Sequence, residues 1–141
     1  MQTVLEVENL RIHYRTKQGI AKAVDGISFS IETGEYLGLV GESGCGKSTV
    51  AKAILQIMAP NAFVASGQIR FQGRDLIGLP AAELRQIRWR DISLVPQSAM
   101  NGFDPVYTVE QQIQEAIRAH ANLPAAERER RIADLLSLIH I

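Results

Sequence analysis

Tyr36-Leu37-Gly38-Leu39-Val40 is followed directly by Gly41-Glu42-Ser43-Gly44-Cys45-Gly46-Lys47-Ser48. The first five residues form a short, nearly continuous apolar run, which is typical of a strand buried on both faces. The next eight match the pattern G-x-x-x-x-G-K-[ST] at every fixed position. Residues 48–58 favour a helix that we expect Pro60 to stop. Strand, glycine-rich loop and helix in this order predict the start of an α/β unit.

The residue types in the loop are those that binding a phosphate requires. Glycines let backbone N–H groups wrap closely around an anion, and the N-terminus of a following helix directs free N–H groups at the same place. Lys47 supplies a positive charge for β- and γ-phosphates, and the Ser48 hydroxyl is a hard oxygen ligand for Mg²⁺. The predicted nucleotide-binding residues of this segment are Gly41, Ser43, Gly44, Cys45, Gly46, Lys47, Ser48 and Thr49.

Length and composition fit one globular domain. The chain has 141 residues, of which 46% are hydrophobic, and 15 Lys and Arg balance 15 Asp and Glu. A net charge of zero gives no electrostatic argument for nucleic acid as a partner. The single cysteine, Cys45, excludes an internal disulfide and fits a reducing compartment. No signal peptide and no apolar run of about 20 residues is visible, so we expect another chain to hold this protein at any membrane.

Alternating apolar and polar residues predict antiparallel strands in the first third of the chain. Leu5 and Val7 alternate with glutamates, Leu10, Ile12 and Tyr14 continue the pattern, and residues 27–31 repeat it. Residues 17–19 and 32–35 are predicted turns, as is the pair 72–73 after another alternating run at 67–71. The sequence therefore predicts a β-subdomain whose sheet has one solvent-exposed face.

The second half of the chain shows one further apolar run and several helical patterns. Residues 92–95 form a second short apolar strand, and residues 81–88 favour a helix. Thr108 and Gln111 match a capping box, and a final helix is expected from about residue 124. Its predicted apolar stripe is Ile132, Leu135, Leu136 and Ile139. The arginines at 85, 88 and 90 are interpreted as a solvated helix face, and the three histidines lack metal-ligand spacing.

The amino-acid sequence of two stretches resembles that of the ATP-binding subunits of ABC transporters, in particular the oligopeptide and dipeptide importer branch. These are GESGCGKST after YLGLV, and VPQSAMNGFDPVYTVEQQI. The resemblance extends to about Leu138. It implies an α/β fold: a partial P-loop NTPase (ABC ATPase) core with an antiparallel β-subdomain and the start of an α-helical subdomain. Residues 1–141 would be a single, truncated nucleotide-binding domain. Residues 1–35 and 62–76 would form mainly the β-subdomain, 36–60 and 90–97 the P-loop core, and 98–141 the Q-loop region and the start of the helical subdomain.

The resemblance assigns roles to two residues outside the loop. Tyr14 matches the aromatic A-loop position, where the ring stacks on adenine. Gln97 matches the Q-loop glutamine, whose amide oxygen helps hold Mg²⁺ and the attacking water. The implied catalytic residues are Lys47 and Gln97, the implied metal ligands are Ser48 and Gln97, and the implied cofactors are ATP and Mg²⁺. The alternative for Tyr14 is a tyrosine that points into a face of the sheet without a binding role. The alternative for Gln97 is an ordinary loop glutamine after a proline.

Partners and location are also implied. Residues 98–106 would face transmembrane permease subunits, and a second ATPase subunit would form a homo- or heterodimer with the full-length form, at the cytoplasmic face of the cell membrane. No nucleic acid partner is expected. Importer relatives usually have Asn-Pro where this chain has Asp104-Pro105, and Leu where it has Phe103. These departures weaken any transfer of substrate.

Three motifs of the family are not found in the 141 residues: an LSGGQ-like signature, a Walker B strand ending in Asp-Glu, and a switch histidine. We therefore expect this chain alone to be inactive in ATP hydrolysis. A natural truncation, a frameshifted reading and a fragment all stay open. The predicted function is the ATP-binding, energy-coupling subunit of an importer for peptides or a related small solute. The alternatives are a truncated inert remnant or a non-transport ABC ATPase. A P-loop kinase or GTPase is disfavoured by Tyr14 and Gln97.

Overall fold

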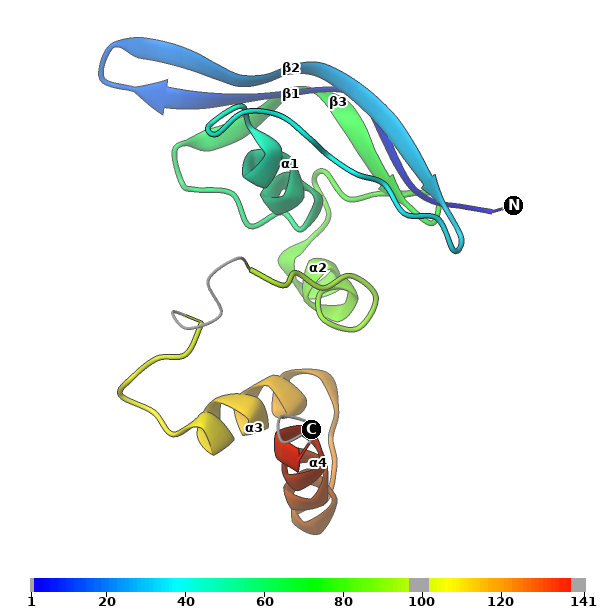
Figure 1. Cartoon of the computed structure of the whole chain (residues 1–141), viewed down its shortest axis with the longest axis vertical. Coiled ribbons are helices and arrows are strands. Elements are labelled where there is room, and N and C mark those ends of the chain that lie inside the picture. The colour runs from blue at the N-terminus through cyan, green and yellow to red at the C-terminus, as the bar shows by residue number, and fades with distance from the viewer. Residues whose placement is uncertain (1, 97–101, 138–141) are drawn as a thin grey trace. The chain divides into compact units, whose positions relative to one another are not determined.

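The computed structural model describes residues 2–96 and 102–137, and the chain divides into two compact units, Met1–Ser93 and Leu94–Ile141. The first unit contains β1 (Thr3–Thr16), β2 (Gly19–Glu32), α1 (Lys47–Ile54), β3 (Ala62–Phe71), β4 (Arg74–Asp75) and α2 (Ala81–Ile87). The second contains α3 (Val109–His120) and α4 (Ala125–Ser137) (Figure 1). Each unit is built differently, with a sheet in the first and a helix pair in the second.

The sheet of the first unit has the strand order β2-β1-β3-β4, and every neighbouring pair is antiparallel. The predicted β-subdomain is therefore confirmed, and so are its turns. β1 and β2 are joined by a turn at residues 17–18. β3 and β4 are joined by Gln72 and Gly73, whose φ angles of 49° and 78° are those of a hairpin turn with two left-handed residues.

A bulge at Asn9 changes which residues of β1 face inward. Before it Leu5 and Val7 are buried, and after it Leu10 and Ile12 are buried, so the inward set shifts from odd to even numbers. Asn9 has a φ of 44°, and its N–H donates to Ser28 Oγ at 2.8 Å. The pairing of β1 with both neighbouring strands shifts at this point. Because one extra residue reverses the alternation of a strand, the bulge joins the two alternating runs that the sequence showed.

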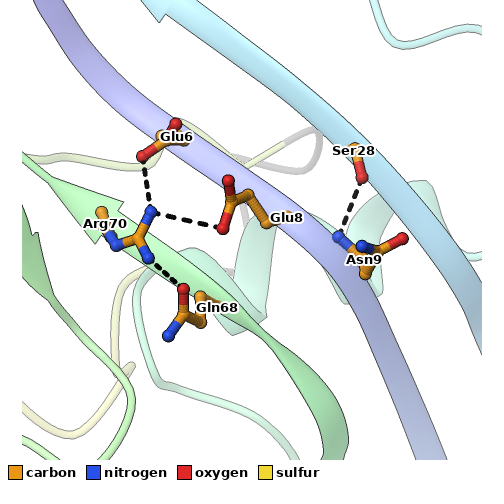
Figure 2. Close-up of polar contacts among 6 residues, drawn as sticks. All are labelled: Glu6, Glu8, Asn9, Ser28, Gln68 and Arg70. Carbon is orange, nitrogen blue, oxygen red and sulfur yellow. Dashed lines mark hydrogen bonds and ion pairs between the residues drawn. The ribbon is translucent and has the colours of Figure 1, made fainter.

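Gly67 makes the bulge sterically possible from the neighbouring strand. A Cβ at this position would lie 2.6 Å from the carbonyl oxygens of Glu8 and Asn9 and from Leu10 Cα, and its φ of 100° is one that glycine tolerates. On the outer face nearby, the Arg70 guanidinium donates to Glu6, Glu8 and Gln68, as Figure 2 shows. The hydrogen bond with Glu6 raises the pKa of Arg70 further above its ordinary value.

The core of the first unit lies between the inner face of the sheet and α1. Two buried residues of α1, Val50 and Ala53, face the strands, and Ile87 of α2 joins them. Figure 1 shows α1 against one face of the sheet. The buried cluster consists of Leu5, Val7, Leu10, Ile12, Val24, Val50, Ala53, Ile69, Phe71, Leu76 and Ile87. Burial of this apolar area fixes the start of α1 relative to β1 and β2.

The helix after the glycine-rich loop ends earlier than predicted. α1 stops at Ile54 rather than near residue 58, because Gln56 adopts a left-handed conformation with φ of 53°. The N–H of Ile57 then donates to the carbonyl of Lys52 at 2.9 Å, which closes the helix end. The interpretation of Arg88 as solvated was wrong: its guanidinium is part-buried and donates to Leu55 O and Gln56 O at 2.7 and 2.6 Å.

The two predicted buried strands are not strands in this structure. Residues 36–40 are irregular, and Tyr36 and Val40 are 98% and 90% exposed. Of residues 92–95, only Ile92 forms a single parallel bridge, with Arg88. A strand in a parallel sheet needs partners for its backbone N–H and C=O groups. Within the described residues no further strand lies beside these segments, so their apolar composition alone does not make them strands.

The second unit is a helical pair whose start follows the sequence closely. Thr108 Oγ1 accepts from the Gln111 N–H at 3.2 Å, and Gln111 Oε1 accepts from the Thr108 N–H at 3.0 Å, so the predicted capping box is confirmed. α3 and α4 pack together. On the predicted stripe of α4, Ile132 is buried but Leu135 is 48% exposed. Ile139 lies outside the described residues.

Candidate functional site

The glycine-rich loop connects the irregular segment 36–40 to α1 and lies against β2. Gly44 and Gly46 have φ angles of 82° and 100°, which other residues rarely adopt. A Cβ on Gly46 would lie 2.6 Å from the Ala23 carbonyl oxygen, and one on Gly41 would lie 2.6 Å from Cys45 Sγ. Gly46 is therefore required by a close backbone contact as well as by its conformation, whereas an added Cβ at Gly41 would have to displace the Cys45 side chain.

Lys47 folds back over the loop that precedes it. Its ammonium donates to the carbonyl oxygens of Gly41 and Glu42 at 2.7 and 2.6 Å, and Cys45 Sγ lies 3.5 Å from the same nitrogen. These contacts hold the positive charge beside the loop backbone instead of letting it extend into solvent. A charged group that is positioned before a ligand arrives loses less conformational entropy when it binds one.

The N-terminus of α1 presents backbone donors. Gly46 is the N-cap residue, and among the described residues no side chain forms a capping hydrogen bond there. The first helical bond runs from the Val50 N–H to the Gly46 carbonyl at 3.0 Å, so the N–H groups before Val50 have no partner within the helix. The Ser48 side chain is exposed at this end. Free N–H groups and the positive end of the helix dipole favour an anion here.

Tyr14 contacts the same helix from the sheet. Its hydroxyl lies 3.2 Å from Thr49 Oγ1, and both residues are half-buried. β1 therefore brings the predicted base-stacking residue to the predicted phosphate-binding helix, 35 residues away in sequence. The stacking role itself stays a prediction. Gln97, the other residue that the resemblance singled out, lies outside the described residues, and so do residues 98–101 of the adjoining loop.

A pocket of about 210 Å³ adjoins the loop. Sequence reasoning missed its wall from β2, whose residues Ala23, Val24 and Asp25 carry no motif. The pocket is lined by Ala23, Val24, Asp25, Ile27, Leu39, Val40, Cys45, Gly46, Lys47 and Val50. One sequence signal was present, because a glycine at position 46 is consistent with a neighbouring backbone that leaves no room for a Cβ. The sequence does not identify β2 as that neighbour. Asp25 is paired with Arg11 at 3.0 Å, so the negative charge that it brings to the pocket lining is partly neutralised.

A metal ion at this site would depend on the ligand that it accompanies. Among residues 2–96 and 102–137, no group of three or more His, Cys, Asp or Glu side chains is placed to hold one. Ser48 offers a single exposed hydroxyl oxygen. That donor set suits Mg²⁺, which is commonly held by few protein oxygens together with phosphates and water.

The chain is similar in sequence to ATP-binding proteins of transporters. The chain is 38% identical to the dipeptide transport ATP-binding protein DppD of Bacillus subtilis, in an alignment that covers 100% of this chain and 42% of that protein. It is 38% identical to the peptidoglycan transport ATP-binding protein YejF of Agrobacterium fabrum, covering 99% of this chain and 26% of that protein. The chain thus spans less than half the length of either relative.

Solved structures show the same fold. The dimeric structure of MJ0796, a bacterial ABC transporter cassette, matches with a TM-score of 0.80 at 22% identity, over 97% of this chain and 57% of that one. A post-hydrolysis state of the same cassette, bound to ADP and Pi, matches with a TM-score of 0.76. The predicted fold class, a partial ABC ATPase fold, is therefore confirmed. Because the sequence model of the family described as ABC transporter matches residues 24–141, the chain belongs to the ABC transporter family.

Proposed function

We propose that this chain binds ATP with Mg²⁺ and forms part of the energy-coupling ATPase subunit of an importer, for peptides or a related small solute. The observation that carries the proposal is the loop at the start of α1. There, glycines, a pre-positioned Lys47 and uncapped helix N–H groups lie together in one place. The family hydrolyses ATP, and the related cassette with bound ADP and Pi supports an adenine nucleotide as the ligand.

Each part of the nucleotide has a proposed contact. The phosphates would be bound by the backbone of residues 41–49, with Lys47 on the β- and γ-phosphates. Ser48 would supply one oxygen to Mg²⁺, with Gln97 as the second ligand. The ring of Tyr14 would stack on adenine, since it lies beside Thr49 at the same helix. When bound, the metal ion would neutralise phosphate charge. Lys47 would hold the phosphates in position.

The importer role rests on the relatives' names and on the family. Relatives that match almost the whole chain are named as dipeptide transport and peptidoglycan transport proteins. The proposed partners are transmembrane permease subunits and a second ATPase subunit, and the proposed location is the cytoplasmic face of the membrane. Among the described residues, no helix is long and apolar enough to cross a bilayer. These two relatives are equally identical to the chain but are named for different solutes, so the proposal names peptides or a related small solute.

The nucleotide-binding part is tested by calorimetric titration with ATP on the wild type, Lys47→Ala and a control, Lys52→Ala. Lys52 lies in the last turn of α1 and is exposed. Charge-assisted hydrogen bonds contribute about 1.5–3 kcal/mol each, so Lys47→Ala is expected to weaken ATP binding roughly 10- to 100-fold. Lys52→Ala should bind as the wild type does. Equal ATP affinity of wild type and Lys47→Ala would contradict the proposal.

The transport part needs a separate measurement. Co-purification of the complete protein with two membrane subunits is expected for an importer ATPase. If the complete protein binds ATP but no membrane protein, the alternative of a non-transport ABC ATPase replaces the importer. If the chain folds and binds no nucleotide, it is an inert remnant.

A further inference from the structure

The hydroxyl groups of Tyr14 and Thr49 connect the two ends of the proposed nucleotide site. They lie 3.2 Å apart, one on β1 and the other in the first turn of α1. The cross-strand partners of Tyr14 are Ala21 on β2 and Ala62 on β3. Both partners carry only a methyl side chain, so neither offers a polar group to the tyrosine hydroxyl. The hydrogen bond to Thr49 gives the tyrosine hydroxyl a polar partner on α1.

The proton inventory of the two hydroxyls gives this hydrogen bond a direction when phosphate is present. A threonine hydroxyl has one proton to donate and two lone pairs to accept with. If Thr49 donates its proton to a phosphate oxygen, it retains lone pairs that accept the proton of Tyr14. Both hydroxyls are then satisfied, and each hydrogen bond polarises the next. The reverse direction would use the Thr49 proton on Tyr14 and leave none for the phosphate.

We propose that the Tyr14 hydroxyl, acting through Thr49, strengthens phosphate binding, in addition to any stacking of the Tyr14 ring. This inference rests on the proposed nucleotide-binding function and makes Tyr14 a positioning residue for the phosphate end of the site. The ring and the hydroxyl would then serve different parts of one ligand. A phenylalanine in place of Tyr14 would retain the ring and lose the hydroxyl function.

The test separates these two functions with two ligands. ATP and inorganic tripolyphosphate are titrated into the 141-residue chain as wild type, Tyr14→Phe, Thr49→Val and the double variant. Tyr36→Phe is the matched control, because Tyr36 is 98% exposed in the same unit. A neutral hydrogen bond corresponds to about a 2- to 10-fold change in affinity. Tyr14→Phe is expected to weaken both ligands by that factor, and to have no further effect once Thr49→Val is present.

Three outcomes of these titrations would overturn the inference. Unchanged affinity of Tyr14→Phe for both ligands would show that the hydroxyl contributes nothing. Weaker binding of ATP alone would place the effect at the base. An equal effect of Tyr14→Phe with and without Thr49→Val would show that it does not act through Thr49. A wild type that binds neither ligand would instead remove the proposed function itself, and the inference with it.

A purely structural role is distinguished by urea unfolding of the same four proteins. The coupling between the two substitutions is measured from the unfolding midpoints with and without tripolyphosphate. The proposal expects a larger coupling with the ligand, because phosphate directs the Thr49 proton. Equal coupling in both conditions would show a hydrogen bond that only supports the fold, and would overturn the proposal.

Discussion

Replacing Gly46 by alanine tests the contact between the glycine-rich loop and β2. Gly46 has a φ of 100°, and an added Cβ would lie 2.6 Å from the Ala23 carbonyl oxygen. The left-handed backbone costs an L-residue about 1–2 kcal/mol, and forcing a methyl group into a packed site adds about 1–3 kcal/mol. Together these predict a loss of about 2–5 kcal/mol in the free energy of unfolding.

Gly34→Ala is the matched control for this substitution. Gly34 also has a left-handed φ, of 79°, but an added Cβ would meet nothing within 4 Å. Only the backbone cost of about 1–2 kcal/mol remains. Urea unfolding followed by circular dichroism gives both losses, and titration with ATP shows whether α1 has moved. We expect ATP affinity to fall in Gly46→Ala alone. Equal losses of stability in the two variants would refute the argument that the Ala23 carbonyl restricts position 46.

Three further predictions concern other parts of the chain. Cys45 is exposed and its Sγ lies 3.5 Å from the Lys47 ammonium, so alkylation of Cys45 should block ATP binding, while Cys45→Ser should retain it. If saturating ATP did not slow the alkylation, the thiol would lie away from the ligand. Arg88→Leu should lose about 1.5–3 kcal/mol of stability, measured by urea unfolding against the exposed control Arg85→Leu. Equal losses would contradict the idea that the Arg88 guanidinium stabilises the end of α1 through Leu55 O and Gln56 O. The 141-residue chain should show no phosphate release that disappears in Lys47→Ala, because general-base assistance alone contributes about 10²–10⁴ in rate; lysine-dependent turnover on the order of 1 s⁻¹ would reveal a catalytic group missed in the sequence.

Local patterns predicted the parts of the fold that local interactions control. The turn at Gln72 and Gly73 and the capping box at Thr108 and Gln111 each depend on a few consecutive residues, and the structure has both. The helix after the loop was also predicted, but not its end. Gln56 adopts its left-handed conformation beside the guanidinium of Arg88, which is 32 residues away, and no local pattern carries that information.

Long-range contacts explain the other differences. The segment 36–40 is apolar enough for a buried strand, but a strand also needs neighbours, which the described residues do not supply. In the candidate site, the glycine-rich loop could be located from the spacing of its glycines, lysine and serine alone. The wall of the pocket from Ala23 to Asp25 could not, because only tertiary packing brings it to the loop, where the Ala23 carbonyl and the Val24 side chain both approach Gly46.

The bulge at Asn9 decides which face of β1 carries Tyr14. Because alternation along β1 is reversed there, Tyr14 reaches Thr49 on the inner side, while His13 packs against Phe63 with ring centroids 5.8 Å apart. Deleting one residue after the bulge, between Leu10 and His13, would exchange the two, so that His13 would lie on the face toward Thr49 and Tyr14 on the opposite face. A single insertion or deletion between Leu10 and Tyr14 is therefore expected to move Tyr14 away from Thr49, whereas loss of the bulge residue itself would restore regular alternation. The number of residues between Leu10 and Tyr14 thus controls the contact with Thr49 as directly as the presence of the tyrosine does.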